Sequence, residues 1–423
     1  MSFDFEAIRS QFPALALTDN GTRRIYLDNP AGTQVPVCVA EAISDCLLTK
    51  SANLGAHFVS SKEAGVVVQS AREAMADFLN APSADEIIFG QNMTTITLHL
   101  SRSIGRLFRP GDEIVLSQMD HDANVWPWVL LARDLELKIR WLPFNKDSFE
   151  FDLDVLDDVL TERTRLVCVG GASNLTGTIN DVTEICAKAR EVGAMTYIDG
   201  VQSAPHIPTN VQAIGCDFFV CSSYKFFGPH QGILWGRREV LEQLEPYSVR
   251  PAPAELPWCF ESGTQNHEGI AGISATIEYF ASIGETMAME KAAEWSHFSG
   301  RRQQVHAAMD MLFDYETSLT SHLIDGLINI DGVTVQGIIA HDALDRRVPT
   351  ISFTHDKVSP ATVAEALAKQ NIFVWNGYNY ALEAAKTLGI DETGGAVRIG
   401  PVHYNSRAEI DELLEALPAV LTN

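Results

Sequence analysis

The sequence predicts an α/β fold, in which a mainly parallel sheet lies between helices and a smaller α+β domain follows. Between about residues 65 and 240, short apolar runs alternate with amphipathic, helix-like segments. Most of these runs are apolar on both faces, which is typical of parallel strands that are buried on both sides. A chain of 423 residues is also too long for one compact core, which favours a large domain and a small one.

Predicted strands and helices alternate in the first part of the chain. The expected strands are the mostly apolar runs at residues 86–89, 113–116, 137–142, 166–169, 195–198 and 218–221. The expected helices, in which apolar residues recur at helical spacing, lie at residues 66–79, 94–108, 126–135, 153–160 and 181–192. The first of them carries Val66, Ala74, Met75, Phe78 and Leu79 on its apolar side. Because a helix separates most neighbouring strands, these strands are expected to run parallel.

From about residue 290 the composition changes, and a second, smaller domain is expected. Its predicted elements are a long helix at 292–327, strands at 333–336, 350–353, 372–375 and 396–399, and helices at 360–370 and 407–417. We therefore divide the chain into an N-terminal arm (1–30) that packs on the small domain, a large domain (31–290) and a small C-terminal α+β domain (291–423).

Charge and cysteine content narrow the class of protein. A net charge of −24 would repel nucleic acid and anionic membranes, so neither is expected as a partner. The seven cysteines show no zinc-site spacing, so no metal is expected, and their odd number fits a reducing cytoplasm. Neither a signal peptide nor an apolar run long enough to cross a bilayer is visible, which predicts a soluble, cytoplasmic protein.

A lysine and an aspartate stand where parallel strands are expected to end. Asp199 closes the strand at 195–198, Lys225 follows the strand at 218–221, and Asn174 follows a third strand. Ligands bind beyond the carboxyl ends of such strands. A lysine amine can form a Schiff base with the aldehyde of pyridoxal 5′-phosphate (PLP), and a carboxylate can keep its pyridine nitrogen protonated. The pattern therefore predicts a PLP site.

Motifs that follow one another along nearly the whole chain point to a family. They lie at residues 26–33, 55–57, 92–95, 120–124, 173–177, 199–202, 222–229, 261–266 and 397–400. With these motifs the chain resembles the class V, fold-type I PLP enzymes, and most closely the cysteine desulfurase and selenocysteine lyase group. The resemblance implies a fold-type I transferase with a mainly parallel, seven-stranded sheet in the large domain.

The resemblance also implies roles for single residues. The implied catalytic residues are Lys225, the Schiff-base lysine and general base, Asp199, which pairs with the ring nitrogen, and His121, which stacks on the ring. The other residues implied to bind the cofactor are Gln202, Asn174, Thr94, Ser222, Met93 through its amide, and Tyr224, which replaces a usual histidine. Thr264 is implied to reach the phosphate of a neighbouring subunit, so a homodimer is expected. The residues implied to bind a substrate amino acid are Arg398, which would hold its carboxylate, His57, Asn29 and Tyr380.

One departure from the desulfurase pattern bears on the reaction. Desulfurases carry a nucleophilic cysteine in a late loop, but residues 374–381 contain none, and Tyr380 stands about where the thiol would be. A persulfide-forming enzyme needs a mobile thiolate. We therefore favour β-elimination by a C–S or C–Se lyase, in which Lys225 takes the α-proton. A class V aminotransferase and an amino-acid epimerase stay open, as does a PLP-binding regulator or scaffold without catalytic activity.

Overall fold

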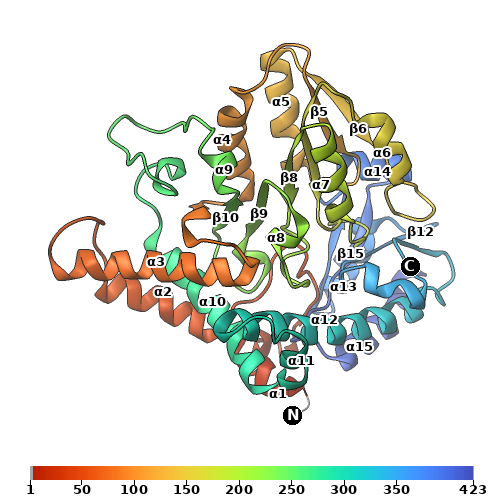
Figure 1. The fold of residues 1–423 in the computed structure, drawn as a ribbon. Helices are drawn as coiled ribbons and strands as arrows, with labels where there is room; N and C mark the ends of the chain where they lie inside the picture. Colours follow the sequence, from red (N-terminus) through yellow and green to blue (C-terminus); the bar gives the residue numbers. More distant parts are fainter. Residues whose placement is uncertain (1–2, 423) are drawn as a thin grey trace.

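The largest sheet has seven strands in the order β4-β10-β9-β8-β7-β5-β6, in a computed structural model that describes residues 3–422 (Figure 1). These strands are β4 (Ile87–Gly90), β5 (Glu113–Ser117), β6 (Lys138–Leu142), β7 (Thr164–Gly170), β8 (Met195–Asp199), β9 (Phe218–Ser222) and β10 (Gly232–Gly236). β10 runs antiparallel to both of its neighbours, and the other strand pairs of this sheet are parallel. The expected α/β fold with a mainly parallel sheet is confirmed.

Helices cover both faces of this sheet, and side chains alternate between two buried clusters along its strands other than the edge strand β6. In β7, Val167 and Val169 belong to one cluster, whereas Leu166 and Cys168 belong to the other. The helices that contribute to the first cluster include α3 (Val59–Leu79), α6 (Leu153–Val159), α7 (Val182–Glu191) and α10 (His267–Thr286). Those that contribute to the second include α4 (Met93–Gly105), α5 (Trp126–Leu135) and α9 (Arg238–Leu241). With both faces covered, a ligand can approach the sheet at its strand ends.

β10 lies outside the strands expected from the sequence pattern. Glycine is depleted in strands, and this element begins with Gly232 and ends with Gly236. Packing nevertheless requires Gly232, because a Cβ there would lie 2.5 Å from the backbone of Asn92. Helix α2 (Val37–Thr49) and α10 likewise lie outside the expected elements. Among the helices of residues 3–422, none combines the length and the apolar character that crossing a bilayer would need.

The C-terminal part forms a four-stranded antiparallel sheet in the order β11-β12-β15-β14 and lies, in blue, on the right of Figure 1. Its elements are α12 (Gly300–Leu327), β11 (Val333–Gln336), β12 (Ile351–His355), α13 (Pro360–Ala368), β14 (Trp375–Gly377), α14 (Leu382–Leu388), β15 (Ala396–Ile399) and α15 (Arg407–Leu421).

Two expectations for this part are wrong in detail. The helix expected at 292–327 is two helices, α11 (Met289–Glu294) and α12, because Ser299 is extended and Gly300 has a φ of 59°. The strand expected at 372–375 is also divided. Its first half, β13 (Ile372–Phe373), pairs with β3 (Ile25–Tyr26), while β14 joins the four-stranded sheet.

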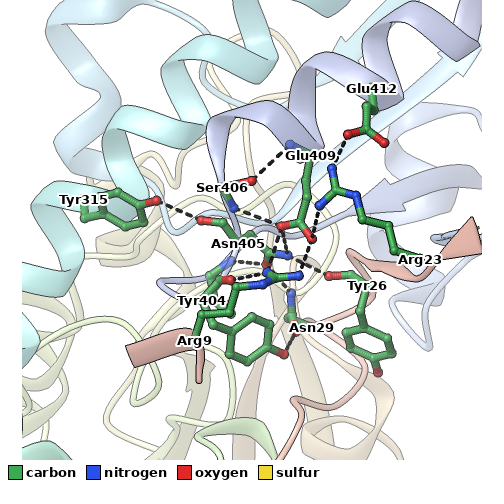
Figure 2. A network of polar contacts seen from close by, with 11 residues as sticks. Arg9, Arg23, Tyr26, Asn29, Tyr315, Tyr404, Asn405, Ser406, Glu409 and Glu412 are labelled. Atoms are coloured by element: carbon green, nitrogen blue, oxygen red, sulfur yellow. Dashed lines mark hydrogen bonds and ion pairs between the residues drawn. The ribbon is translucent and has the colours of Figure 1, made fainter. Parts of the chain in front are cut away.

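A buried polar network around Glu409 fastens the N-terminal segment to α15 (Figure 2). Arg9 donates two hydrogen bonds to the Glu409 carboxylate, at 2.8 and 3.2 Å. Asn405 donates to the same carboxylate at 3.2 Å and to the Tyr26 carbonyl at 3.0 Å, and it accepts from the Asn29 amide at 3.1 Å. The chain from Arg9 to Asn29 is therefore held against the C-terminal helix. The domain boundaries themselves stay a prediction.

Candidate active site

A cavity of about 350 Å³ lies at the carboxyl ends of the parallel strands. The sheet brings its lining together from the segments that follow β4, β5, β7, β8 and β9. The predicted residues on its wall are Met93, Thr94, His121, Asn174, Asp199, Gln202, Ser222, Tyr224 and Lys225. Asp120 and His230 also line it and lie outside the predicted set. The structure thus gathers every residue predicted to bind the cofactor except Thr264.

Lys225 ends the short turn that follows β9. Its Nζ donates a hydrogen bond to the Pro30 carbonyl and lies 5.2 Å from the centre of the Tyr224 ring. Burial and the positive charge of Arg398 lower the pKa of Lys225 to about 7. Near neutral pH a large share of this amine is therefore unprotonated, which is the form that attacks an aldehyde.

Two buried carboxylic acids line the cavity. Asp199, at the end of β8, accepts a hydrogen bond from the Val201 amide at 2.9 Å, and burial raises its pKa to about 6. Asp120 accepts from the Gly170 amide at 2.9 Å and from the Asn124 side chain at 2.7 Å, and burial raises its pKa to about 7. Both oxygens of Asp120 are thus bonded within the protein, whereas Asp199 is bonded through Oδ1. Asp199 is therefore the better partner for a ligand nitrogen.

His121 is a neutral ring on the cavity wall. Its Nδ1 accepts a hydrogen bond from the Ala123 amide at 3.0 Å, so its proton resides on Nε2. Burial, with the charges of Lys225 and Arg398, lowers the pKa of His121 to about 3. The ring stacks with that of Tyr380, and the two ring centres lie 5.3 Å apart. A flat, uncharged ring at this place suits the stacking role predicted for it.

One part of the wall is suited to an anion. Helix α4 begins at Met93, whose amide donates to Ser222 Oγ at 3.0 Å and leaves the hydroxyl proton of Ser222 for another acceptor. Thr94, the next residue, is exposed and also lines the cavity. The Met93 amide, expected to bind the cofactor, is thus engaged by Ser222, and the Thr95 amide is bonded to the Asn92 side chain. The Thr94 amide at the start of this 13-residue helix, with the hydroxyls of Thr94 and Ser222, makes a suitable set of phosphate ligands. With the amine of Lys225 and the buried Asp199, this set fits PLP.

Two further wall residues contact side chains that lie outside the predicted motifs. The Gln202 amide donates to Thr350 Oγ1 at 2.6 Å, so a residue just before β12 orients it. The Tyr224 ring stacks on His230, with ring centres 4.9 Å apart and ring planes at 9°. No spacing rule predicts His230, because only the fold of the turn after β9 brings it against Tyr224.

Arg398, on β15, contacts the cavity wall through Asn174. Its Nη1 donates to the Asn174 carbonyl at 3.1 Å, and its Nη2 lies 3.7 Å from Asp28 Oδ1. Asn174 in turn donates to the Asn379 carbonyl at 2.5 Å. Arg398 is buried, and its charge contributes to the lowered pKa of Lys225. Arg398 is itself absent from the cavity lining but is bonded to Asn174, which lines it.

Asn29 and His57, both predicted to bind substrate, lie off the cavity wall. Asn29 requires a correction: its amide donates to the Gly400 carbonyl and to Asn405, and its oxygen accepts from the Tyr404 hydroxyl. Because both donors and the oxygen are engaged within the protein, this side chain has a structural role. His57 is exposed in the connection between α2 and α3.

Tyr380 and Thr264 also lie off the wall. Tyr380 is 76% exposed and covers one side of the His121 ring. Thr264 lines a separate cavity of about 430 Å³, together with Asn53 and Leu54. Completion of a neighbouring subunit's site by Thr264 stays a prediction.

No cysteine is placed to act as a nucleophile here. All seven are free, six of them are buried and Cys38 is partly buried. Burial raises the pKa of each thiol. None of them lines the cavity. Residues 3–422 therefore offer no reactive thiolate at this site.

The chain is similar to known proteins over its full length. A family model described as aminotransferase class-V matches residues 25–305 and 304–413. A probable cysteine desulfurase of Streptomyces coelicolor is 34% identical, over 99% of this chain and 97% of its own length. A cysteine desulfurase of Pectobacterium atrosepticum is 31% identical, over 99% of this chain and 98% of its own length.

Solved structures of cysteine desulfurases are also similar to this chain. The apo structure of a cysteine desulfurase from Thermococcus onnurineus has a TM-score of 0.87 and 26% identity, with the whole of both chains covered. A cysteine desulfurase from Escherichia coli, in an S-sulfonic acid form, has a TM-score of 0.81 at 26% identity, with 100% and 99% of the two chains covered. The expected family, fold type and cofactor are confirmed. The chain belongs to the class-V aminotransferase family and is a PLP-dependent enzyme.

Proposed function

We propose that this enzyme cleaves a carbon–sulfur or carbon–selenium bond of an amino acid by β-elimination, without a protein-bound persulfide. The relatives named cysteine desulfurases support an amino acid with sulfur on its β-carbon as the substrate class. The observation that carries the proposal is the composition of the cavity wall, which holds Lys225, Asp199 and His121 but no cysteine. Such a wall supports removal of the α-proton and offers no thiolate to attack sulfur.

The cofactor would be held by residues that already have suitable charge and geometry. Lys225 would bind PLP covalently, and Asp199 would hold a proton at the pyridine nitrogen. The hydroxyls of Ser222 and Thr94 and the Thr94 amide would bind the phosphate, and His121 would stack on the ring. When bound, PLP withdraws electrons from the α-carbon of an attached amino acid.

The substrate would be oriented by Arg398 and Asn174. Nε of Arg398 and Oδ1 of Asn174 are buried without a hydrogen-bond partner, which supports a ligand between them. Arg398 would bind the substrate carboxylate. The neutral Nζ of Lys225 would then take the proton from Cα. The Cβ–S bond breaks with its electron pair on sulfur, which takes up a proton and leaves as sulfide or a thiol.

A homodimer is part of the proposal, with Thr264 completing the neighbouring site. Apolar side chains at the connection of α2 and α3 support it, because Leu48, Phe58 and Val59 are 81%, 57% and 69% exposed. Leu54, in the same connection, lines the cavity that Thr264 lines. A cytoplasmic location also stays a prediction, supported by the seven unpaired cysteines.

We expect light scattering to give the mass of a dimer, and Thr264→Ala to lower PLP affinity by about tenfold while the dimer persists. Thr286→Ala, at the exposed end of α10, is the matched control and should leave both quantities unchanged. A protein that is monomeric in light scattering and still binds PLP tightly would contradict this part of the proposal.

Lys225 is tested by spectroscopy. The purified protein with PLP is expected to show the visible absorption of lysine-bound cofactor, and Lys225→Ala is expected to lose it. Lys188→Ala removes a surface lysine that pairs with Asp157 at 2.6 Å, and this control should keep the band. A wild-type protein that shows no band after addition of PLP rules out the assigned role of Lys225.

A panel of L-amino acids then separates the reaction types. β-elimination predicts sulfide, pyruvate and ammonia from cysteine, or selenide in place of sulfide from selenocysteine. A D-amino acid as product would instead indicate an epimerase, and an oxo acid with aminated cofactor would indicate an aminotransferase. Alanine together with a protein-bound persulfide would show that a thiol takes part, against the proposal.

A further inference from the structure

Arg398 already has an anionic partner inside the protein. Its Nη2 lies 3.7 Å from Oδ1 of Asp28, and the two side chains are 5% and 14% exposed. Asp28 is absent from the residues assigned to the site so far. A substrate carboxylate that binds Arg398 would therefore arrive beside an existing carboxylate.

This corner contains a group of polar atoms without hydrogen-bond partners. Among the buried side-chain atoms of residues 3–422 that lack such a partner are Asp28 Oδ1, Asn174 Oδ1, Asn379 Oδ1 and Arg398 Nε. Contacts between these residues show that the atoms lie together: Arg398 contacts Asp28 and Asn174, and Asn174 contacts Asn379. Buried polar groups are normally hydrogen-bonded, so these four atoms indicate a place where a bound ligand would supply the missing partners.

The backbone around Asp28 is fixed. Asp28 forms a β-bridge with Gly400, and the next side chain, Asn29, donates to the Gly400 carbonyl at 2.6 Å. Asn29 is also part of the network that joins the N-terminal segment to Glu409 (Figure 2). The carbonyl of Pro30 accepts the hydrogen bond from Lys225. A backbone movement that took Asp28 away from Arg398 would break these contacts, so the backbone keeps Asp28 beside Arg398.

We propose that Asp28 is a built-in counter-ion of Arg398, and that a substrate carboxylate can replace it only when Asp28 takes up a proton. The inference rests on the proposed function, in which Arg398 binds that carboxylate. Two carboxylates that share one guanidinium in a buried site repel each other, and a proton on one of them removes the repulsion. Asp28 thereby selects against anionic ligands when it is ionised and admits them when it is neutral.

The charges that face Asp28 agree with this role. Burial raises the pKa of Asp28 to about 6, although the charges of Arg398 and Lys225 oppose the shift. Tyr26 also faces it and stays uncharged, since burial raises the pKa of its phenol to about 12. A ligand carboxylate on Arg398 weakens the main charge that opposes protonation, so binding raises the pKa of Asp28 further.

The test is the binding of propionate, a carboxylate without an amino group, to the PLP-loaded enzyme, measured by calorimetry. In the wild type we expect Kd to rise about fivefold between about pH 6 and about pH 7, and binding to take up a proton from the buffer. Asp28→Asn should bind about tenfold more tightly at about pH 7 and lose most of this pH dependence. Asp19→Asn, which removes the partner of Arg24 at 2.7 Å, is the matched control and should behave like the wild type.

The outcomes separate this inference from the proposed function. If propionate binds but its Kd does not change with pH, no proton is linked to binding and the role of Asp28 is wrong. If Asp28→Asn keeps the wild-type dependence, the role of Asp28 is also wrong and a group such as Asp199 titrates instead. If propionate binds the wild type at no pH, the carboxylate site at Arg398 is itself wrong. Should Asp28→Asn fail to load PLP or to fold, Asp28→Ser and the proton uptake of the wild type in buffers of different ionisation enthalpy decide the question.

Discussion

Lys225 and Arg398 are two cationic groups in one small volume, and this arrangement determines the state of the amine that must react. Burial and the charge of Arg398 lower the pKa of Lys225 to about 7. Below that pH the amine is protonated and does not attack an aldehyde, and above it the neutral amine is available. Replacing the charge of Arg398 should therefore move the pKa of Lys225 upward.

This gives a kinetic prediction for the apoenzyme. The rate at which PLP enters, followed by its visible absorption, is expected to rise with pH and to level off above about pH 7. In Arg398→Gln the midpoint should move to higher pH, whereas Arg346→Gln, which removes an exposed partner of Glu150, should leave it unchanged. A midpoint that stays in place in Arg398→Gln would show that burial alone lowers the pKa.

At the residue scale, the sequence predicts the groups that stand at strand ends. Asp199 and Lys225 could be found because each follows an apolar run and carries chemistry that PLP requires. Asp120 could have been added, since it precedes His121 at the end of another strand. His230 could not be found, because its stacking on Tyr224 depends on how the turn after β9 folds back.

At the scale of elements, the phosphate-binding part depends on how closely β10 approaches the start of α4. A Cβ on Gly232 would lie 2.5 Å from the backbone of Asn92, the residue that caps α4. A larger residue at position 232 must therefore displace Asn92, and with it the adjoining residues Met93 and Thr94. Because glycine has no side chain, Gly232 allows both the pairing of β10 in the sheet and the close approach of α4 at the cofactor site.

We expect Gly232→Ala to weaken PLP binding by about tenfold, because a small displacement of a ligating turn is costly. Gly65→Ala is the matched control: it lies inside α3 with nothing within 4 Å of the added Cβ. That substitution should leave PLP affinity unchanged and raise stability by up to about 1 kcal/mol. Equal PLP affinities of the two variants, measured by titration, would disprove this account of Gly232.

At the scale of the whole molecule, the two ends of the chain meet at Glu409 (Figure 2). This side chain is fully buried and accepts hydrogen bonds from Arg9 and from Asn405. Through Asn405 and Asn29 the same network supports the segment that carries Asp28 and Pro30. The geometry around Lys225 and Arg398 therefore depends on residues that lie near both ends of the chain.

Glu409→Gln removes one charge from a buried pair and is expected to lower the free energy of unfolding by about 3 kcal/mol. Glu412→Gln removes an exposed partner of Arg23 and should change it by less than about 0.5 kcal/mol. Urea titration of both variants measures the difference. Equal values for the two would mean that the network around Glu409 does not hold the N-terminal segment.

The local pattern of the chain by itself determined which segments form the parallel strands and which residues stand at their ends. Apolar runs bury themselves on both faces of a sheet, and this requirement is visible residue by residue. The pattern therefore predicted the α/β fold, a PLP site and the strand-end residues Asp199, Lys225 and Asn174, while the other residues expected around the cofactor came from the family resemblance. It also showed that the loop around Tyr380 has no thiol.

Only the tertiary structure decided the contacts between segments that are far apart in sequence. It placed β10 between β4 and β9, and it turned Asn29 from a predicted substrate ligand into a structural residue. It also set Asp28 beside Arg398, 370 residues away along the chain. Periodicity reports how a segment buries its own side chains, but the partner of a polar group depends on which distant segment packs against it.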